Sequence, residues 1–91
     1  MSFEWDNEKA ATNLEKHGIT FMEAATVFAD LRAVTKPDID HSGFESRFQT
    51  LGFSEQLRIL LVVTTERDDN IRIISARKAT SPERREYEQH R

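Results

Sequence analysis

The sequence of 91 residues contains no cysteine, so it can form neither a disulfide nor a thiolate metal site. This absence is typical of proteins that fold in a reducing cytosol. Long apolar runs are also missing, since the longest, residues 59–63, falls far short of the roughly 20 residues that span a bilayer. The N-terminal stretch MSFEWDNEK is acidic and has no apolar signal-peptide segment. These absences predict one soluble domain over residues 1–91, cytoplasmic and without a membrane partner.

The sequence also lacks an excess of positive charge, because its formal net charge is −3 at pH 7. The charges are nevertheless unevenly distributed. Residues 1–71 contain 7 Lys or Arg against 13 Asp or Glu, whereas residues 72–91 contain 6 Lys or Arg against 3 Glu. A local basic surface binds phosphate even on an acidic protein. Mixed charge on a last helix can equally serve only to keep that helix solvated, so charge alone leaves both interpretations open.

Two helices are predicted near the N-terminus. Asp6 is a suitable N-cap, and Gly18 a suitable left-handed C-terminal residue, for a helix over residues 7–17. The Thr-x-x-Glu pattern that begins at Thr20 predicts a second helix, which ends near Ala29. The two helices form an αα-hairpin.

A meander of antiparallel strands is predicted after the helices. Runs of β-branched and aromatic residues between turn formers give strands at about residues 32–36, 44–53, 57–65 and 71–77. The strand over residues 57–65 is apolar on both of its faces, which places it at the centre of the sheet. Alternation at residues 3–5 allows one additional short strand at an edge.

A last helix is predicted over residues 82–90, starting from Ser81 before Pro82. Tyr87 is its sole apolar anchor, and so short a helix with one anchor is poorly stable in isolation. It either docks through Tyr87 and arginine stems or becomes ordered with a partner. The predicted fold class is therefore α+β: an N-terminal αα-hairpin packed on a three- to four-stranded antiparallel meander sheet, followed by a C-terminal helix.

The predicted strand pairing places two arginines on one face of the sheet. Hairpins that close symmetrically place Arg47 opposite Val63 and Ile73. One face of the sheet then carries four polar side chains, namely Arg47, Gln49, Ser75 and Arg77. Arginines on an otherwise apolar face need partners, because an unpaired buried charge is costly. Either acids such as Glu45 or Glu66 neutralise them in structural salt bridges, or they bind phosphate, which a guanidinium holds with two hydrogen bonds.

Several segments resemble a known family. They are residues 3–6, 16–19, 45–47, 65–67 and 71–79. These segments are similar to the BrnT toxins of type II toxin–antitoxin systems, and the resemblance covers nearly the whole chain. The combination of Lys-His-Gly near the start with Ile-Ile-Ser-Ala-Arg-Lys-Ala near the end is specific, whereas either piece alone is weak.

The resemblance implies a RelE/ParE-like fold and a metal-independent endoribonuclease that cleaves mRNA, inhibits translation and needs no cofactor. It implies a BrnA-like antitoxin with a ribbon-helix-helix domain as partner, and contact with operator DNA only through the antitoxin complex. The alternative is a non-catalytic protein-binding module or an inactive toxin homologue. The acidic net charge and the absence of an unambiguous base–acid pair favour that alternative.

Cleavage of RNA without a metal requires a base for the 2′-hydroxyl, a cation for the phosphorane charge and an acid for the leaving oxygen. The predicted catalytic residues are His17, Glu45, Arg47 and Arg77. The predicted substrate-binding residues are Lys16, Glu66, Arg67, Arg72, Lys78 and Tyr87. Structural interpretations stand beside these, with His17 as a capping histidine and Tyr87 as a docking anchor. No metal site is predicted, because no two histidines have the spacing of helical ligands.

Overall fold

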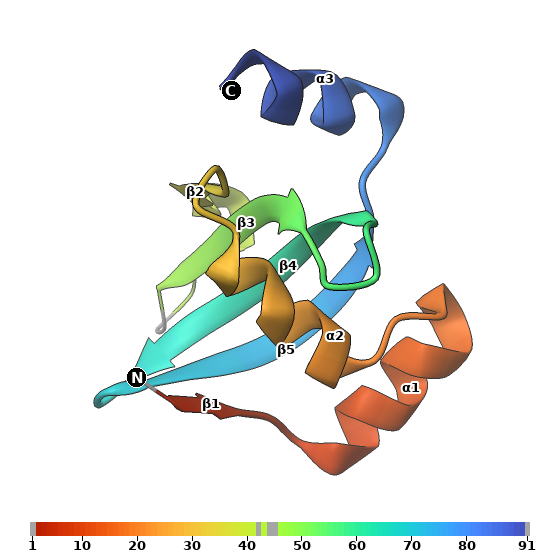
Figure 1. Cartoon of the computed structure of the whole chain (residues 1–91). Coiled ribbons are helices and arrows are strands. Elements are labelled where there is room, and N and C mark those ends of the chain that lie inside the picture. The colour runs from red at the N-terminus through yellow and green to blue at the C-terminus, as the bar shows by residue number, and fades with distance from the viewer. Residues whose placement is uncertain (1, 42, 44–45, 91) are drawn as a thin grey trace.

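The computed structural model describes residues 2–41, 43 and 46–90, which form a five-stranded sheet flanked by helices (Figure 1). The sheet order is β1-β5-β4-β3-β2. The strands are β1 Ser2–Glu4, β2 Val34–Pro37, β3 Arg47–Phe53, β4 Ile59–Arg67 and β5 Asn70–Lys78. The helices are α1 Asn7–His17, α2 Phe21–Thr26 and α3 Ser81–Gln89, with short 3-10 helices η1 Val27–Ala29 and η2 Ile39–His41. The α+β class is confirmed, and no described helix is long and apolar enough to cross a membrane.

Helix α1 is bounded by the two caps that its sequence predicts. The Asp6 carboxylate accepts a hydrogen bond from the Glu8 N–H at 2.8 Å, which satisfies a donor that the first turn leaves unpaired. At the other end Gly18 has φ +71° and donates its N–H to the Leu14 carbonyl at 2.8 Å. Glycine adopts this left-handed backbone without steric cost. The predicted bounds of α1 are confirmed.

Helix α2 begins at the predicted cap, where Thr20 Oγ1 accepts from the Glu23 N–H at 3.0 Å. Its α-helical part ends at Thr26, earlier than predicted, and the chain continues through η1 to Ala29. η1 lies directly against β3 at Gly52, where a Cβ atom would stand 2.8 Å from Val27 Cγ1. The absence of a side chain at Gly52 therefore allows this close approach.

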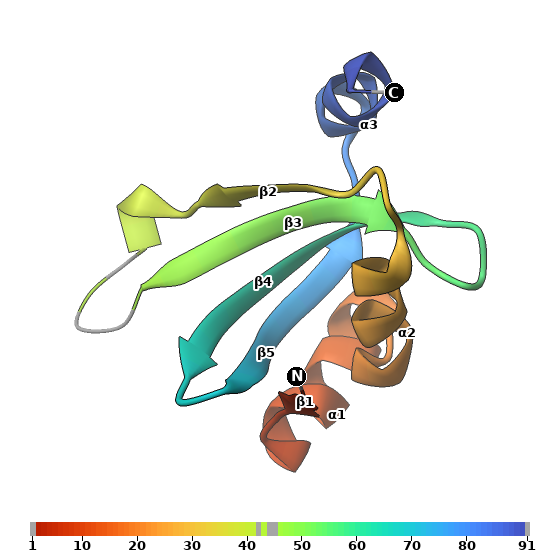
Figure 2. The same cartoon turned by 60° about the vertical axis from the view of Figure 1, so that its left-hand side comes forward.

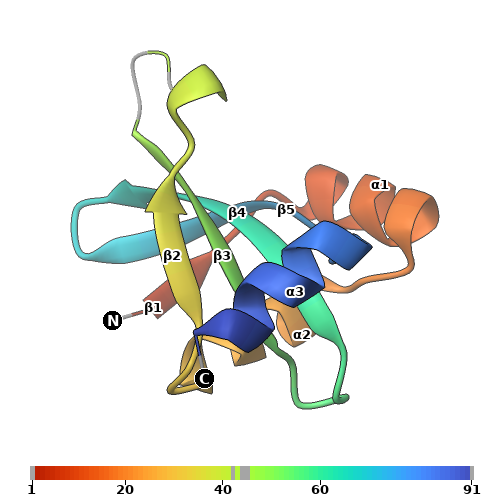
Figure 3. The ribbon, with the colours of Figure 1, turned by 90° about the horizontal axis from the view of Figure 1, so that it is seen from above.

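Helices α1 and α2 cover one face of the sheet, and α3 crosses the other (Figures 2 and 3). The main core lies under α1 and α2 and consists of Ile19, Phe21, Ala24, Val27, Leu60, Val62, Ile73 and Ala76. Trp5 packs edge-on against Phe21 with ring centroids 6.0 Å apart. A smaller cluster of Leu51, Leu61 and Tyr87 lies under α3. The central position predicted for β4 is confirmed, since it has two strands on each side.

Asn13 fastens α1 to the edge of β5. Strand β1 pairs only with the first three residues of β5, so the following part of that edge has no strand neighbour. There the Asn13 side chain donates to the Ala76 carbonyl at 2.8 Å and accepts from the Ala76 N–H at 3.1 Å. It also donates to the Ile19 carbonyl at 3.0 Å and is 5% exposed. One amide side chain thus replaces a strand partner for buried backbone groups.

The prediction of a purely antiparallel sheet is wrong, because β1 runs parallel to β5. Phe3 pairs with Ile71 and Glu4 pairs with Arg72. The three strands β3, β4 and β5 do form the predicted antiparallel meander. Hairpins have local turn signals, whereas a parallel pair joins segments far apart in the sequence and has none.

The register of the meander also differs from the predicted one. Arg47 lies opposite Thr65 rather than Val63, because the connection between β3 and β4 is longer than predicted. The last pair of that hairpin is Phe53 with Ile59, so residues 54–58 form the turn. A shift of two residues preserves the side-chain alternation, and the face that carries Arg47 is therefore the predicted one.

A β-bulge in β5 changes the direction of the side chains that precede it. The register with β4 shifts by one residue there, and Ile74 is the extra residue. As a result Ile73 is buried in the main core at 1% exposure, whereas Arg72 lies on the same face as Arg47. The prediction that Ile73 lies opposite Arg47 is wrong, because it assumed an unbroken strand. Bulges often turn a side chain to a new direction in this way.

Helix α3 is capped by Thr80, not by Ser81 as predicted. Thr80 Oγ1 accepts from the Glu83 N–H at 3.4 Å, and the Glu83 carboxylate accepts from the Thr80 N–H at 2.8 Å. This reciprocal arrangement is a capping box, which requires the acid three residues after the cap. Only Thr80 has Glu83 at that spacing.

Tyr87 docks α3 onto the sheet, as predicted, and is 3% exposed. Its hydroxyl donates to Asp30 at 2.5 Å. The Asp30 carboxylate also accepts from the backbone N–H groups of Phe53 at 2.9 Å and Arg32 at 3.0 Å. Burial acts to raise the pKa of Asp30, but these hydrogen bonds outweigh it and lower that pKa. A carboxylate adds to the docking, since Glu86 pairs with Lys36 of β2.

We expect Asn13→Ala to destabilise the fold, because it leaves the backbone groups of Ala76 and the carbonyl of Ile19 without partners. Each buried group left unpaired costs about 1–3 kcal/mol, so the free energy of unfolding should fall by about 3 kcal/mol. Urea unfolding followed by circular dichroism measures this change. Thr12→Ala, an exposed neighbour on α1, is the control. An equal loss in both variants would contradict the role assigned to Asn13.

We expect Tyr87→Phe to reduce both stability and its pH dependence. The folded pKa of Asp30 is lowered, so its contribution to stability is present above the ordinary carboxyl pKa and is lost as pH falls through the folded value. Removing the donor should cost about 2 kcal/mol at pH 7 and much less near pH 2. Unfolding measured at both pH values tests this. If Tyr87→Phe lowers the free energy of unfolding by the same amount at both pH values, the charge of Asp30 is not the cause.

Candidate functional site

A groove of about 390 Å³ lies between α1 and β5. Its walls include Lys9, Thr12, Lys16 and His17 from α1 and Ile74 and Ser75 from β5. Two acids, Asp6 and Glu8, line the end of the groove where α1 begins. Asn13 is turned into the edge of β5, and residues four before and three after it lie on the same side of a helix. Lys9 and Lys16 are therefore directed to the groove by the contact that holds the helix. We call this the α1–β5 groove.

Three arginines lie together on the sheet face opposite the main core, and we call them the arginine patch: Arg47, Arg67 and Arg72. Arg47 and Arg72 both pair with Thr65, from opposite sides, so their backbones are about 10 Å apart. Thr65 itself is only 1% exposed. Arg67 lies two residues further along β4, on the same face.

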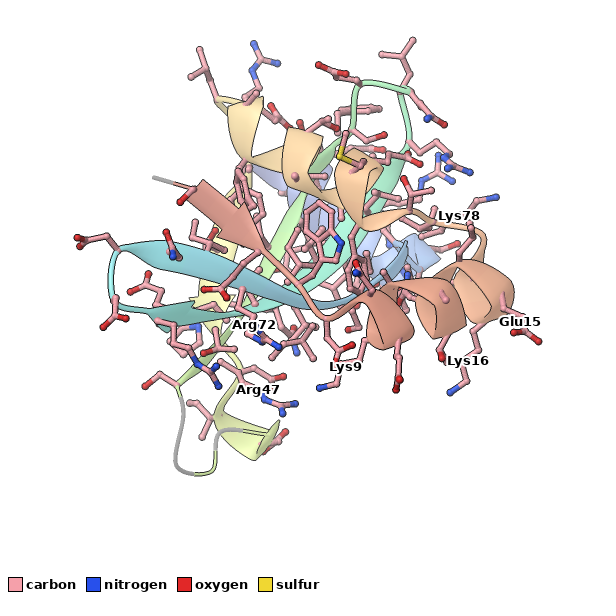
Figure 4. The ribbon with its side chains drawn as sticks, turned by 90° about the horizontal axis from the view of Figure 1, so that it is seen from below. Lys9, Glu15, Lys16, Arg47, Arg72 and Lys78 are labelled. Carbon is pink, nitrogen blue, oxygen red and sulfur yellow. The ribbon has the colours of Figure 1, made fainter. Side chains whose placement is uncertain are left out.

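The arginine patch and the lysines of α1 lie on one side of the molecule. Figure 4 shows Arg47 beside Arg72, then Lys9, and then Lys16 further along α1. Helix α1 has 11 residues, so it extends about 16 Å and His17 lies at its far end. The structure thus brings Arg47 and Arg72 together and places His17 at the other end of a row of cations.

Glu4 is a member of this surface that sequence reasoning did not identify. Its Oε2 atom lies 3.1 Å from Nη1 of Arg72, and both side chains are partly exposed. An ion pair of this kind adds little to stability, so its main effect is to orient the guanidinium. Only the parallel pairing of β1 with β5 brings the two residues together, and the sequence carries no local signal for it.

Arg77 occupies a different environment. Its guanidinium makes two hydrogen bonds to Glu83, at 2.8 and 3.0 Å, and a third to the Lys78 carbonyl at 3.2 Å. The hydrogen bond from Arg77 lowers the pKa of Glu83, and the same contact raises the pKa of Arg77. Arg77 is five residues from Arg72 along β5, about 16 Å away. It therefore lies in a salt bridge at the start of α3, which is the structural interpretation of this residue.

The remaining predicted residues are dispersed. Glu66 is exposed at the end of β4 and shares a shallow cavity with Asp68 and Asp69, an acidic environment for a phosphate. Lys78 lines a separate cavity beneath the start of α3. Tyr87 is buried, and its ring is covered while α3 is docked. Glu45 lies outside the described residues.

The side chains of this surface suit the binding of a polyanion. Arginine forks and lysine ammonium groups bind phosphate oxygens, and an imidazole in the same groove can transfer a proton. Within the part of the chain that the structure describes, no group of three His, Asp or Glu side chains could hold a metal ion. The polar residues of this surface therefore offer hydrogen bonds, positive charge and proton transfer.

Comparison with known proteins identifies the family. Residues 5–83 match the family model described as the ribonuclease toxin BrnT of type II toxin–antitoxin systems. Among solved structures, the chain is similar to the ribonuclease toxin BrnT of Brucella abortus, with a TM-score of 0.69 and 26% sequence identity. That likeness covers 89% of this chain and 99% of the Brucella chain. No significant match is found among curated proteins.

The family match and the structural likeness agree over most of the chain. They also agree with the arrangement of three helices on a mixed five-stranded sheet. The wider likeness to RelE/ParE toxins stays a prediction. The chain belongs to the BrnT family of ribonuclease toxins of type II toxin–antitoxin systems.

Proposed function

We propose that this protein is a metal-independent endoribonuclease that cleaves mRNA and thereby inhibits translation. The observation that supports this most directly is the arginine patch, which lies on the same side of the molecule as Lys9 and Lys16 of the α1–β5 groove. An RNA backbone placed along this row would meet the arginines first and then the two lysines. The row also ends at an imidazole, the group most often used for proton transfer.

In the proposed reaction the 2′-oxygen of one nucleotide attacks the adjacent phosphorus. The 2′-oxygen–phosphorus bond forms and the bond from phosphorus to the 5′-oxygen breaks, which leaves a 2′,3′-cyclic phosphate and a 5′-hydroxyl. A base removes the 2′-hydroxyl proton, and an acid supplies one to the leaving oxygen. Arg47 and Arg72 would stabilise the charge on the non-bridging oxygens. A glutamate such as Glu4, which pairs with Arg72, would transfer the proton there, whereas His17, at the far end of α1, would act only on a phosphate held in the groove.

Family membership implies an antitoxin partner and an RNA substrate. We propose that the antitoxin is BrnA-like, with a ribbon-helix-helix domain, and that operator DNA is contacted only through the complex. We further propose that the toxin acts in the cytoplasm, where its mRNA substrate is found. Lys9 and Lys16 would bind phosphates that flank the cleaved one, because they line the groove beside Ser75.

We expect the purified protein to cut single-stranded RNA in the presence of EDTA. Arg47→Gln should lower the cleavage rate about 100-fold or more, because it removes a cation from the developing charge. Glu4→Gln should lower it by a similar factor if this carboxylate moves the proton, whereas His17→Asn should have a smaller effect, because His17 lies at the far end of α1 from the two arginines. Gel analysis of a labelled RNA measures the rate, and Arg85→Gln, an exposed arginine of α3, is the matched control.

Intact RNA at high protein concentration, with EDTA or with magnesium, would contradict this proposal. Tight binding of the antitoxin without growth arrest on expression would then favour the non-catalytic module. Equal activity in Arg47→Gln, Arg85→Gln and the unmodified protein would show that the arginine patch is not the site of cleavage.

The predicted catalytic role of Arg77 can be separated from its structural role by comparing two variants. Glu83→Gln breaks the same salt bridge as Arg77→Gln but leaves the guanidinium in place. If Arg77 acts only as an anchor for α3, both variants should lose stability and activity to a similar degree. If Arg77 also binds the phosphate, Arg77→Gln should be at least about tenfold less active than Glu83→Gln. Cleavage rates and urea unfolding of both proteins decide between these outcomes.

A further inference from the structure

A second cavity, of about 290 Å³, lies between the β3–β4 turn and the segment that leads into α3. Its lining includes Phe53, Leu57, Arg58, Ile59, Lys78 and Arg84. It combines an apolar floor with a cationic rim. It is separate from the α1–β5 groove, with which it shares none of its lining residues.

The floor presents apolar side chains to solvent in a strained turn. Leu57 is 80% exposed and has φ +63°, a left-handed backbone that leucine seldom adopts. Phe53 is 40% exposed and packs edge-on against the ring of Tyr87, with centroids 5.5 Å apart. Strained conformations persist where the surrounding structure fixes them, and they are frequent at binding sites.

The turn that carries Leu57 is held by a buried carboxylate. Glu23 of α2 is 4% exposed and accepts hydrogen bonds from Ser54 Oγ at 2.6 Å and Arg58 Nε at 2.9 Å. The hydrogen bond from Arg58 is the largest contribution that lowers the pKa of Glu23, against the effect of burial. The ion pair neutralises Arg58 and fixes one wall of the cavity, so binding there requires little ordering of the turn.

The other two cations of the rim have no such partner. Lys78 and Arg84 are both exposed, and among the described contacts no hydrogen bond or ion pair uses their side-chain nitrogens. Glu23 is hydrogen-bonded to Arg58 and is also within electrostatic range of Lys78, so the rim has more positive than negative charge beside an apolar floor. Sites that bind single-stranded nucleic acid combine cations with aromatic side chains.

We infer that this cavity is a subsite for one nucleotide of single-stranded RNA, with the base on Phe53 and Leu57 and its phosphate on Lys78 and Arg84. The inference rests on the proposed ribonuclease function and extends it to the path of the substrate. Lys78 is three residues from Ser75, so the subsite lies about 10 Å along β5 from the α1–β5 groove. Ser75 and Lys78 point to opposite faces of the sheet, so an RNA strand that occupies both sites would pass around the end of β5.

The test uses a fluorescent 2′-O-methyl oligonucleotide, which cannot be cleaved because its 2′-oxygen is blocked. In anisotropy titrations the double variant Lys78→Gln/Arg84→Gln should bind about tenfold more weakly than the unmodified protein. The slope of log affinity against log salt should fall by about 0.7, the value for one lost phosphate contact on a single strand. Arg85→Gln removes a charge outside the cavity and should leave both quantities nearly unchanged.

A second variant tests the base contact without disturbing the fold. Leu57→Asn keeps a residue that tolerates a left-handed backbone, so the turn should retain its stability. Its affinity for the oligonucleotide should fall severalfold, whereas its affinity for an abasic oligomer of the same length should not change. Leu31→Asn, at a leucine that is 101% exposed and outside the cavity, is the control.

Unchanged affinity and salt slope in the double variant, together with normal RNA cleavage by the unmodified protein, would overturn the subsite and leave the ribonuclease proposal intact. An equal loss for the abasic oligomer in Leu57→Asn would overturn its assignment to a nucleotide. Polyglutamate binding to this rim as tightly as the oligonucleotide would also overturn it. Failure of the unmodified protein to cleave RNA would instead contradict the ribonuclease proposal, and the titrations do not depend on cleavage.

Discussion

The placement of α1 beside the sheet depends on the three hydrogen bonds of Asn13. They hold α1 against the part of β5 that has no strand neighbour, and so they form the groove between the two elements. The same contact determines which side of α1 faces the sheet, and therefore where Lys9 and Lys16 lie. Buried backbone groups of β5 need a partner whatever the function is. Asn13 provides that partner, and the same hydrogen bonds position Lys9 and Lys16.

An acidic chain can present a locally cationic surface where its cations gather on a few neighbouring elements. Glu23 binds Arg58, Glu83 binds Arg77, and Asp30 holds the docked α3 through Tyr87. The first two contacts each use one cation and one carboxylate, so they leave the charge balance unchanged, whereas Asp30 is held without a cation. The arginine patch lies elsewhere, and one carboxylate of that surface, Glu4, pairs with Arg72. The net charge of −3 therefore does not describe the field that a polyanion meets there.

Local signals in the sequence were sufficient for the helices and the meander. The caps at Asp6 and Gly18 fixed α1, and alternation placed Arg47 on the correct face of the sheet. The features that assemble the site have no local signal. The bulge at Ile74 brings Arg72 to the face of Arg47, and the parallel strand β1 adds Glu4. Both follow from tertiary packing, which a pattern of hydrophobic residues cannot specify.

The sheet face on which α3 docks is apolar at one end and polar at the other. Along β3 the residues on this face change from Arg47 to Gln49 to Leu51, and the opposing positions of β4 are Thr65, Val63 and Leu61. Helix α3 packs over the apolar end, where Tyr87 contacts both leucines. Arg77 lies at that end, opposite Leu61, and so it serves the helix through Glu83. Arg47 and Arg72 lie at the polar end, beyond the cluster that α3 covers.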